Sequence, residues 1–117
     1  MSPKPQLEPR KLTWSVLIGR WVDFARSALA LPDHEEGRRL KDSVPDIIML
    51  QAVWFALQHL DELGPDERAL GLDRAELLIE THSRHLHARW HESSMPSMLS
   101  EIMNDARCQF EVVAGRH

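Results

Sequence analysis

The chain has 117 residues, enough for one domain with a single hydrophobic core. Its 43% hydrophobic and 27% charged residues indicate a soluble globular protein, and its net charge of −4, with histidines neutral, argues against a nucleic-acid or anionic-lipid partner. The one cysteine, Cys108, excludes an intramolecular disulfide, and the N-terminus has no apolar secretory segment, so we expect a cytoplasmic protein with no membrane contact.

The first predicted helix follows a proline-rich arm. Residues 1–11 contain three prolines and almost no apolar side chains, which predicts a disordered arm. Thr13 is a suitable N-cap for a helix that we expect to reach about Leu31. At about 100° per residue, one face of this helix collects Trp14, Leu17, Ile18, Trp21, Phe24, Ala25 and Ala28. The pattern predicts an amphipathic helix whose tryptophans pack in the core.

A short charged helix is predicted next. Pro32 stops the first helix, and the charged segment 34–42 is expected to form a short helix on the surface. Ser43 follows directly and is the expected N-cap of the third helix.

The third helix is the most apolar stretch of the chain. It is expected to run from Val44 to Leu63, with Gly64 as its C′ residue and Pro65 just beyond its end. Between residues 47 and 57 the only polar residue is Gln51. A helix that is apolar nearly all round is a buried helix, so we expect this one to be central, with the other helices packed around it.

One side of this central helix carries a narrow polar stripe of Gln51, Gln58 and Glu62, bordered by Trp54 and Phe55. In a monomeric bundle this side would face water and leave an apolar patch, which usually marks a partner surface. We therefore expect a homodimer, since two-fold dimers are the commonest oligomers. Its expected contact residues are Val44, Ile47, Ile48, Gln51, Trp54, Phe55 and Gln58. The alternative is that the short helix or the N-terminal arm covers the stripe.

Residues 66–76 are expected to contain the end of one short helical turn and the start of the next long helix. A helical turn over residues 66–70 is expected to end at Gly71. Asp73 and Glu76 then form a D-x-x-E capping pattern for a helix that we expect to reach about His91.

The last helix is expected to begin after Pro96 and to end at Gly115. Short connections make successive helices antiparallel neighbours. The sequence therefore predicts an all-α fold, an up-and-down antiparallel bundle of four long helices plus one short helix, as a single domain over residues 12–114.

Four histidines lie in the segment E-T-H-S-R-H-L-H-A-R-W-H, and helical geometry separates them into two pairs. His82 and His85 lie with Arg89 on the face that we assign to the core. A guanidinium there needs a carboxylate or an anionic ligand as its partner. The carboxylates considered are Asp23, Asp61, Glu62, Glu101, Asp105 and Glu111. Either these side chains form structural hydrogen bonds, or His82, His85 and Arg89 line a site for a divalent transition metal or a small anion.

His87 and His91 form the other pair, on the opposite face. Their separation of four residues allows two imidazoles to share a zinc or nickel ion. Two ligands are an incomplete set, so we expect only a weak surface metal site there. The sequence has no G-x-S-x-G motif, no glycine-rich phosphate loop, no C-x-x-C pair and no Glu-x-x-His motif.

These patterns together predict a small interaction or regulatory module rather than an enzyme, with no cofactor and with self-association through the central helix. The alternative is a metal- or small-anion-binding protein, or an enzyme, that uses the inward-facing histidines with a divalent transition metal.

Overall fold

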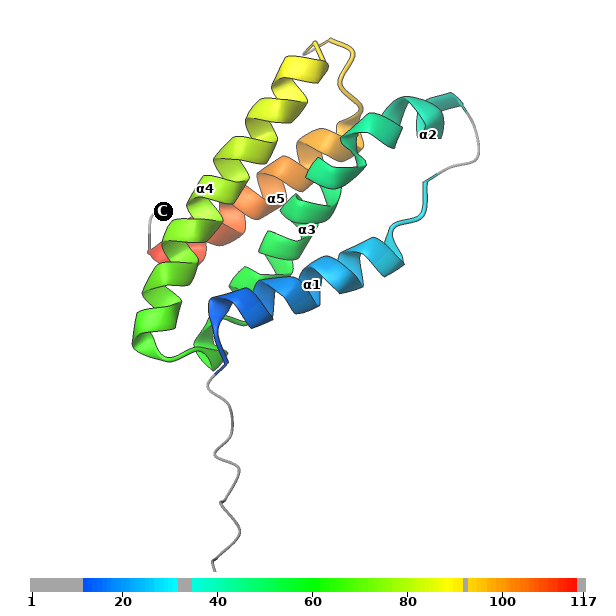
Figure 1. The fold of residues 1–117 in the computed structure, drawn as a ribbon. Coiled ribbons are helices and arrows are strands. Elements are labelled where there is room, and N and C mark those ends of the chain that lie inside the picture. The colour runs from blue at the N-terminus through cyan, green and yellow to red at the C-terminus, as the bar shows by residue number, and fades with distance from the viewer. Residues whose placement is uncertain (1–11, 32–34, 92, 116–117) are drawn as a thin grey trace, which may run out of the picture.

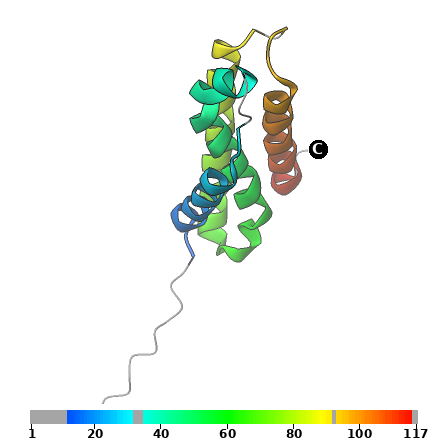
Figure 2. The ribbon, with the colours of Figure 1, turned by 90° about the vertical axis from the view of Figure 1, so that its right-hand side faces the viewer.

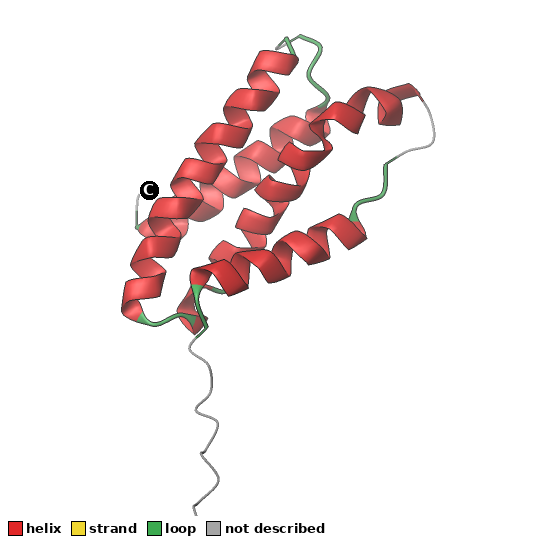
Figure 3. Cartoon of the chain, in the orientation of Figure 1, coloured by secondary structure: helices red, strands yellow, loops and turns green. Residues whose placement is uncertain are grey.

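The computed structural model describes residues 12–31, 35–91 and 93–115, and all regular structure in these ranges is helical (Figures 1 and 3). The helices are α1 (Trp14–Ala28), α2 (Glu35–Leu40), α3 (Val44–Gln58), α4 (Pro65–Arg89) and α5 (Ser97–Ala114). Figure 1 shows that α1, α3, α4 and α5 alternate in direction along the chain. The predicted up-and-down helical bundle is confirmed. None of the described helices is long and apolar enough to cross a membrane.

Helix α3 is the centre of the bundle. It packs against α1, α4 and α5, and Figure 2 shows α1 and α5 on different sides of it. Four of its aliphatic side chains, those of Ile47, Leu50, Val53 and Leu57, are buried in the hydrophobic core. This arrangement follows from its composition, because a helix without a polar face needs neighbours on most of its sides.

The start of α1 is held by two side chains. The Thr13 hydroxyl accepts the Val16 backbone N–H at 3.2 Å, which confirms Thr13 as the N-cap. From α4, a Glu67 carboxylate oxygen accepts the Trp14 backbone N–H at 2.9 Å. Two of the amides left without partners in the first turn are therefore satisfied, one of them by another helix. The predicted arm, residues 1–11, lies outside the described residues.

Helix α3 begins at Val44, as predicted, but its cap and its end differ from the prediction. A 3₁₀ turn (Lys41–Ser43) runs directly into α3, so Ser43 has a helical backbone and its side chain does not cap the helix. At the other end α3 stops at Gln58, followed by a second 3₁₀ turn (Leu60–Glu62). The predicted cap was wrong because the Ser43 hydroxyl is used in tertiary hydrogen bonds.

The signals at Gly64 and Pro65 mark the beginning of a helix instead of the end of one. Gly64 is the N-cap of α4, with extended backbone, and Pro65 lies in its first turn. Proline is favoured there because its fixed φ suits a helix and its missing N–H would have had no partner. The same two residues are compatible with either reading, and the chain path decided between them.

Helix α4 passes through Gly71 without a break, so the predicted start at Asp73 was wrong. The backbone of Gly71 lies against the core, where an added Cβ would be 2.8 Å from Trp14 Cε3 and 3.0 Å from Leu60 Cδ2. Gly71 thus permits a close approach between α4 and α1, and does not end the helix. The predicted end of the last helix is confirmed, since Gly115 follows α5 with a φ of 74°.

We expect Gly71→Ala to destabilise the protein by about 1–3 kcal/mol, because the rigid Trp14 ring must move to admit the methyl group. Gly19→Ala is the matched control in α1, since an added Cβ there meets no heavy atom within 4 Å. It should stabilise the protein by about 0.5–1 kcal/mol through its better helix propensity. Urea unfolding of both variants measures the difference, and equal stabilisation would contradict the close packing at Gly71.

Candidate functional site

A buried carboxylate lies where α3 begins. Asp46 is in the first turn of α3 and is only 4% exposed. The positive end of the helix dipole favours a carboxylate at this position, but burial away from water is unfavourable for an unpaired charge. Donors for it come from α4, which lies alongside α3.

Three side chains of α4 converge on Asp46. Asp46 Oδ1 lies 2.8 Å from Nδ1 of His82 and 3.0 Å from Nδ1 of His85. Asp46 Oδ2 accepts a hydrogen bond of 3.0 Å from the Arg89 guanidinium. The three donors are spaced i, i+3 and i+7, which places them on one face of a helix. Because a carboxylate only accepts, each Nδ1 that bonds to it carries the proton.

Behind this cluster, Ser43 and Trp90 form a second layer. The Ser43 hydroxyl oxygen accepts from the Arg89 guanidinium at 3.1 Å and from Trp90 Nε1 at 3.0 Å. Both Ser43 and Trp90 are buried. Arg89 is thus held at both a carboxylate and a hydroxyl oxygen, so its guanidinium has a defined position. We call Asp46, His82, His85, Arg89 and Ser43 the polar cluster.

The polar cluster changes the acidity of Asp46. Burial raises the pKa of its carboxyl group, but the hydrogen bonds from His82, His85 and Arg89 lower it by more, with a further contribution from the charge of His82. The net effect is a pKa below the usual value for aspartate. Asp46 is therefore ionised in the folded protein at neutral pH.

The prediction that His82, His85 and Arg89 share one face is consistent with these contacts, but their carboxylate partner is not among the six considered. The histidines differ in exposure, since the His82 side chain is 16% exposed and the His85 side chain 52%. The position of Asp46 in the first turn of α3 explains why a carboxylate is favourable there, but does not predict its partners. Asp46, Leu50 and Val53 are spaced i, i+4 and i+7, so they share the most deeply buried face of α3. This spacing is the sequence signal that the Asp46 carboxylate is buried and needs donors.

The structure does not bring His87 and His91 together on one helix. Helix α4 ends at Arg89, and Trp90 has an extended backbone, so His91 does not continue the helical spacing. Both histidines are exposed. Among the described residues, three side chains that can ligate a metal lie close together, those of Asp46, His82 and His85.

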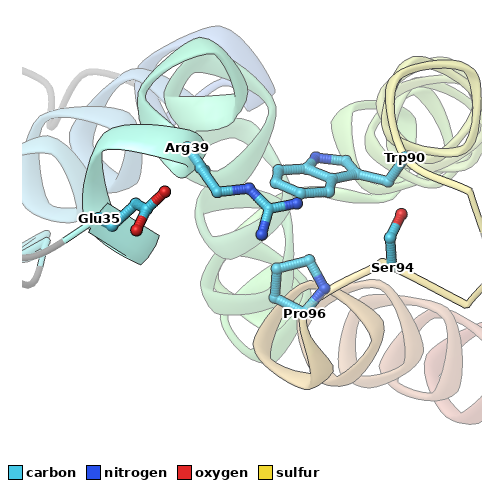
Figure 4. A pocket seen from close by; sticks show the side chains of 5 residues that line it. All are labelled: Glu35, Arg39, Trp90, Ser94 and Pro96. Atoms are coloured by element: carbon cyan, nitrogen blue, oxygen red, sulfur yellow. The ribbon is translucent and has the colours of Figure 1, made fainter.

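A cleft of about 390 Å³ borders the polar cluster, between α2 and the connection from α4 to α5. Its lining residues are Glu35, Arg39, Trp90, Ser94 and Pro96 (Figure 4). The Arg39 guanidinium lies over the Trp90 ring, 5.3 Å from its centroid. This cation–π contact covers one face of the Trp90 indole, whose N–H donates to the Ser43 hydroxyl oxygen.

A second feature, on α1 and α3, is aromatic. The ring of Phe55 stacks on Trp21 with centroids 4.9 Å apart, and Phe24 contacts both rings edge-on at 5.3 and 5.4 Å. Trp54 lies next to Phe55, with centroids 4.9 Å apart. Phe24 is 49% exposed, and the other three rings are half-buried. We call Trp21, Phe24, Trp54 and Phe55 the aromatic surface.

The residues predicted for self-association divide into two groups. Ile47 and Ile48 are buried within the single chain, so their side chains are part of its core instead of its surface. The remaining five keep some exposure: Val44, Gln51, Trp54, Phe55 and Gln58. Between α3 and α5 a depression of about 110 Å³ is lined by Leu50, Gln51, Trp54, Phe55, Ile102 and Asp105. Within the described residues, α2 packs mainly on the 3₁₀ turn before α3 and does not cover this stripe.

We expect Asp46→Asn to reduce the loss of stability in acid. Because the pKa of Asp46 is lowered by folding, the unfolded chain takes up this proton first as the pH falls below about 4. The stability from Asp46 is thus complete above that pH and is lost as the pH falls through the pKa of the folded state.

Urea unfolding of the variant and the wild type between about pH 2 and pH 7 measures this effect, since that range covers the titration of carboxyl groups. A chelator is added so that bound metal ions do not affect the stability. Asp46→Asn should be less stable at neutral pH by about 1–3 kcal/mol, since it weakens buried hydrogen bonds. Its stability should fall less steeply in acid than that of the wild type. Parallel curves for the two proteins would show that Asp46 does not contribute to acid denaturation.

The comparisons with known proteins assign no family. No protein-family model, curated protein or solved structure matches this chain. Support for a function therefore comes from the geometry of the polar cluster and the aromatic surface.

Proposed function

We propose that the protein is a small helical interaction module that self-associates through the aromatic surface and the adjoining stripe of α3. The observation that carries this proposal is that Trp54 and Phe55, two large aromatic side chains of the central helix, remain partly exposed next to a half-exposed Phe24. Clustered exposed aromatic side chains are typical of interfaces, where they supply large contact areas from rigid rings.

The packing of α3 leaves room for this contact. Its neighbours are α1, α4 and α5, and Gln51, Trp54 and Phe55 line the depression between α3 and α5. A second copy placed there by a two-fold axis would present the same aromatic side chains to one another. The polar ends of the two glutamines suit the rim of such an interface, where contact with water is retained.

Stacking within the chain prepares the surface for binding. Phe55 is held between Trp21 and Phe24, so these rings lose little further freedom when a partner arrives. Aromatic side chains bury about 150–250 Å² each when fully enclosed, and the part of these four rings that is still exposed is available toward the roughly 800 Å² per partner of a standard interface.

The test replaces two residues of the aromatic surface, in the variant Phe24→Gln/Trp54→Gln. Phe55 is retained because it stacks on Trp21. If both residues lie near the centre of the interface, each replacement should weaken the dimer by about 2 kcal/mol, or roughly 30-fold in Kd. Sedimentation velocity over a range of concentrations measures the change, with circular dichroism to establish that the variant is folded.

The matched control is Leu77→Gln/Val112→Gln, which removes two exposed apolar side chains from α4 and α5. This control should dimerise as the wild type does. A wild type that is monomeric at all concentrations would refute self-association. An aromatic variant that dimerises as strongly as the control would place the interface elsewhere.

A further inference from the structure

Three potential metal ligands converge in the polar cluster. Asp46 Oδ1 lies within 3.0 Å of an Nδ1 atom from each of His82 and His85, and one ligand atom from each residue lies within 4.8 Å of the others. Two imidazole nitrogens and one carboxylate oxygen form a ligand set that suits divalent transition metals better than Mg²⁺ or Ca²⁺, which prefer oxygen.

The spacing of these atoms is close to that of a bound ion. Ligands at about 2.0–2.2 Å from a metal, with angles between 90° and 109°, lie about 2.8–3.6 Å apart. The two nitrogen–oxygen distances are 2.8 and 3.0 Å. These two distances are therefore already those of ligands that share an ion, and the site forms when the three ligand atoms, all within 4.8 Å of one another, close on one ion. Coordination requires that each Nδ1 give up its proton, to Nε2 of the same ring or to water, which frees the Nδ1 lone pair for the metal.

From this geometry we infer that Asp46, His82 and His85 form a binding site for one divalent transition metal ion, such as Zn²⁺ or Co²⁺. The site joins the first turn of α3 to the last third of α4. Three protein ligands leave at least one coordination position for water or another small ligand. The half-exposed side chain of His85 places the site near solvent, so an ion can enter without unfolding of the bundle.

Arg89, which sequence patterns group with the two histidines, is a positioning residue in this site. A guanidinium has no lone pair to offer a metal. Its hydrogen bond to Asp46 Oδ2 leaves Oδ1 directed at the histidines, and its bond to Ser43 fixes its own position. Groups that hydrogen-bond to a ligating carboxylate typically change metal affinity by about 10–100-fold when removed.

The experiment uses the full chain without a histidine tag. Titration with Co²⁺, followed by visible absorption, reports inner-sphere nitrogen ligands, and calorimetry with Zn²⁺ measures affinity and stoichiometry. We expect one ion per chain, and a rise in Tm on the order of 10 °C when free Zn²⁺ is about 100 times its Kd. Absence of a Co²⁺ spectrum, with no rise in Tm, would overturn the proposal.

A matched pair of double variants locates the site. His82→Ala/His85→Ala should weaken Zn²⁺ binding by at least about 100-fold, because two ligands are lost. His87→Ala/His91→Ala removes the same number of imidazoles from the same region and should bind within about twofold of the wild type, since both side chains are exposed outside the site. Equal loss in both variants, or loss only in the second, would assign the ion to surface histidines.

Two further variants guard against loss of binding through unfolding. His85→Ala changes only a half-exposed side chain and should still weaken binding by at least about tenfold. Arg89→Ala should weaken binding by about tenfold with an unchanged Co²⁺ spectrum, because the three ligands remain. An altered spectrum, or a folded His85→Ala protein with full affinity, would contradict these assignments. Neither result depends on whether the chain forms dimers.

Discussion

The burial of α3 is the constraint on which the rest of the structure depends. An apolar helix with almost no polar face is stable in water only when other helices cover most of it. Helices α1, α4 and α5 do so, and each presents its own apolar side chains to the same core. Gly71 shows how close this packing is, because α4 has no room for even one methyl group opposite Trp14 and Leu60.

The same burial creates the polar cluster. Within the described part of the chain, Asp46 is the one charged residue that is buried. It lies on the most enclosed face of α3. Desolvation of a carboxylate is unfavourable unless donors replace the lost water. His82, His85 and Arg89 supply these donors from one face of α4. The cluster therefore ties the start of α3 to the end of α4, and two of these donors, His82 and His85, are the residues that we propose as metal ligands together with Asp46.

The two candidate functional features occupy different sides of α3. At about 100° per residue, Trp54 and Phe55 lie roughly 80–180° around the helix from Asp46. The aromatic surface extends from α3 onto α1, whereas the polar cluster extends onto α4. A partner at the first and a metal ion at the second can therefore be bound at the same time. Metal binding would stiffen the contact between α3 and α4 without changing the residues that we propose for self-association.

The sequence by itself determined the helical class, the central position of α3 and most of the helix boundaries, because hydrophobic periodicity and capping are local properties. It also grouped His82, His85 and Arg89 on one face of α4, since that grouping depends only on helical spacing. The sequence left open the positions where one residue type is compatible with two different backbone structures. Gly64 and Pro65 suit either end of a helix, and Gly71 is compatible with a break or with close packing.

Only the tertiary structure decided which residues meet across the chain. Asp46 and His82 are 36 positions apart, and six other carboxylates were equally acceptable partners for Arg89 until the pairing of α3 with α4 was known. Ser43 accepts bonds from Arg89 and Trp90 instead of capping α3, a choice that depends on where α4 ends. Ile47 and Ile48 turned out to be core residues, because the exact rotation of α3 between its neighbours determines which side of it remains exposed.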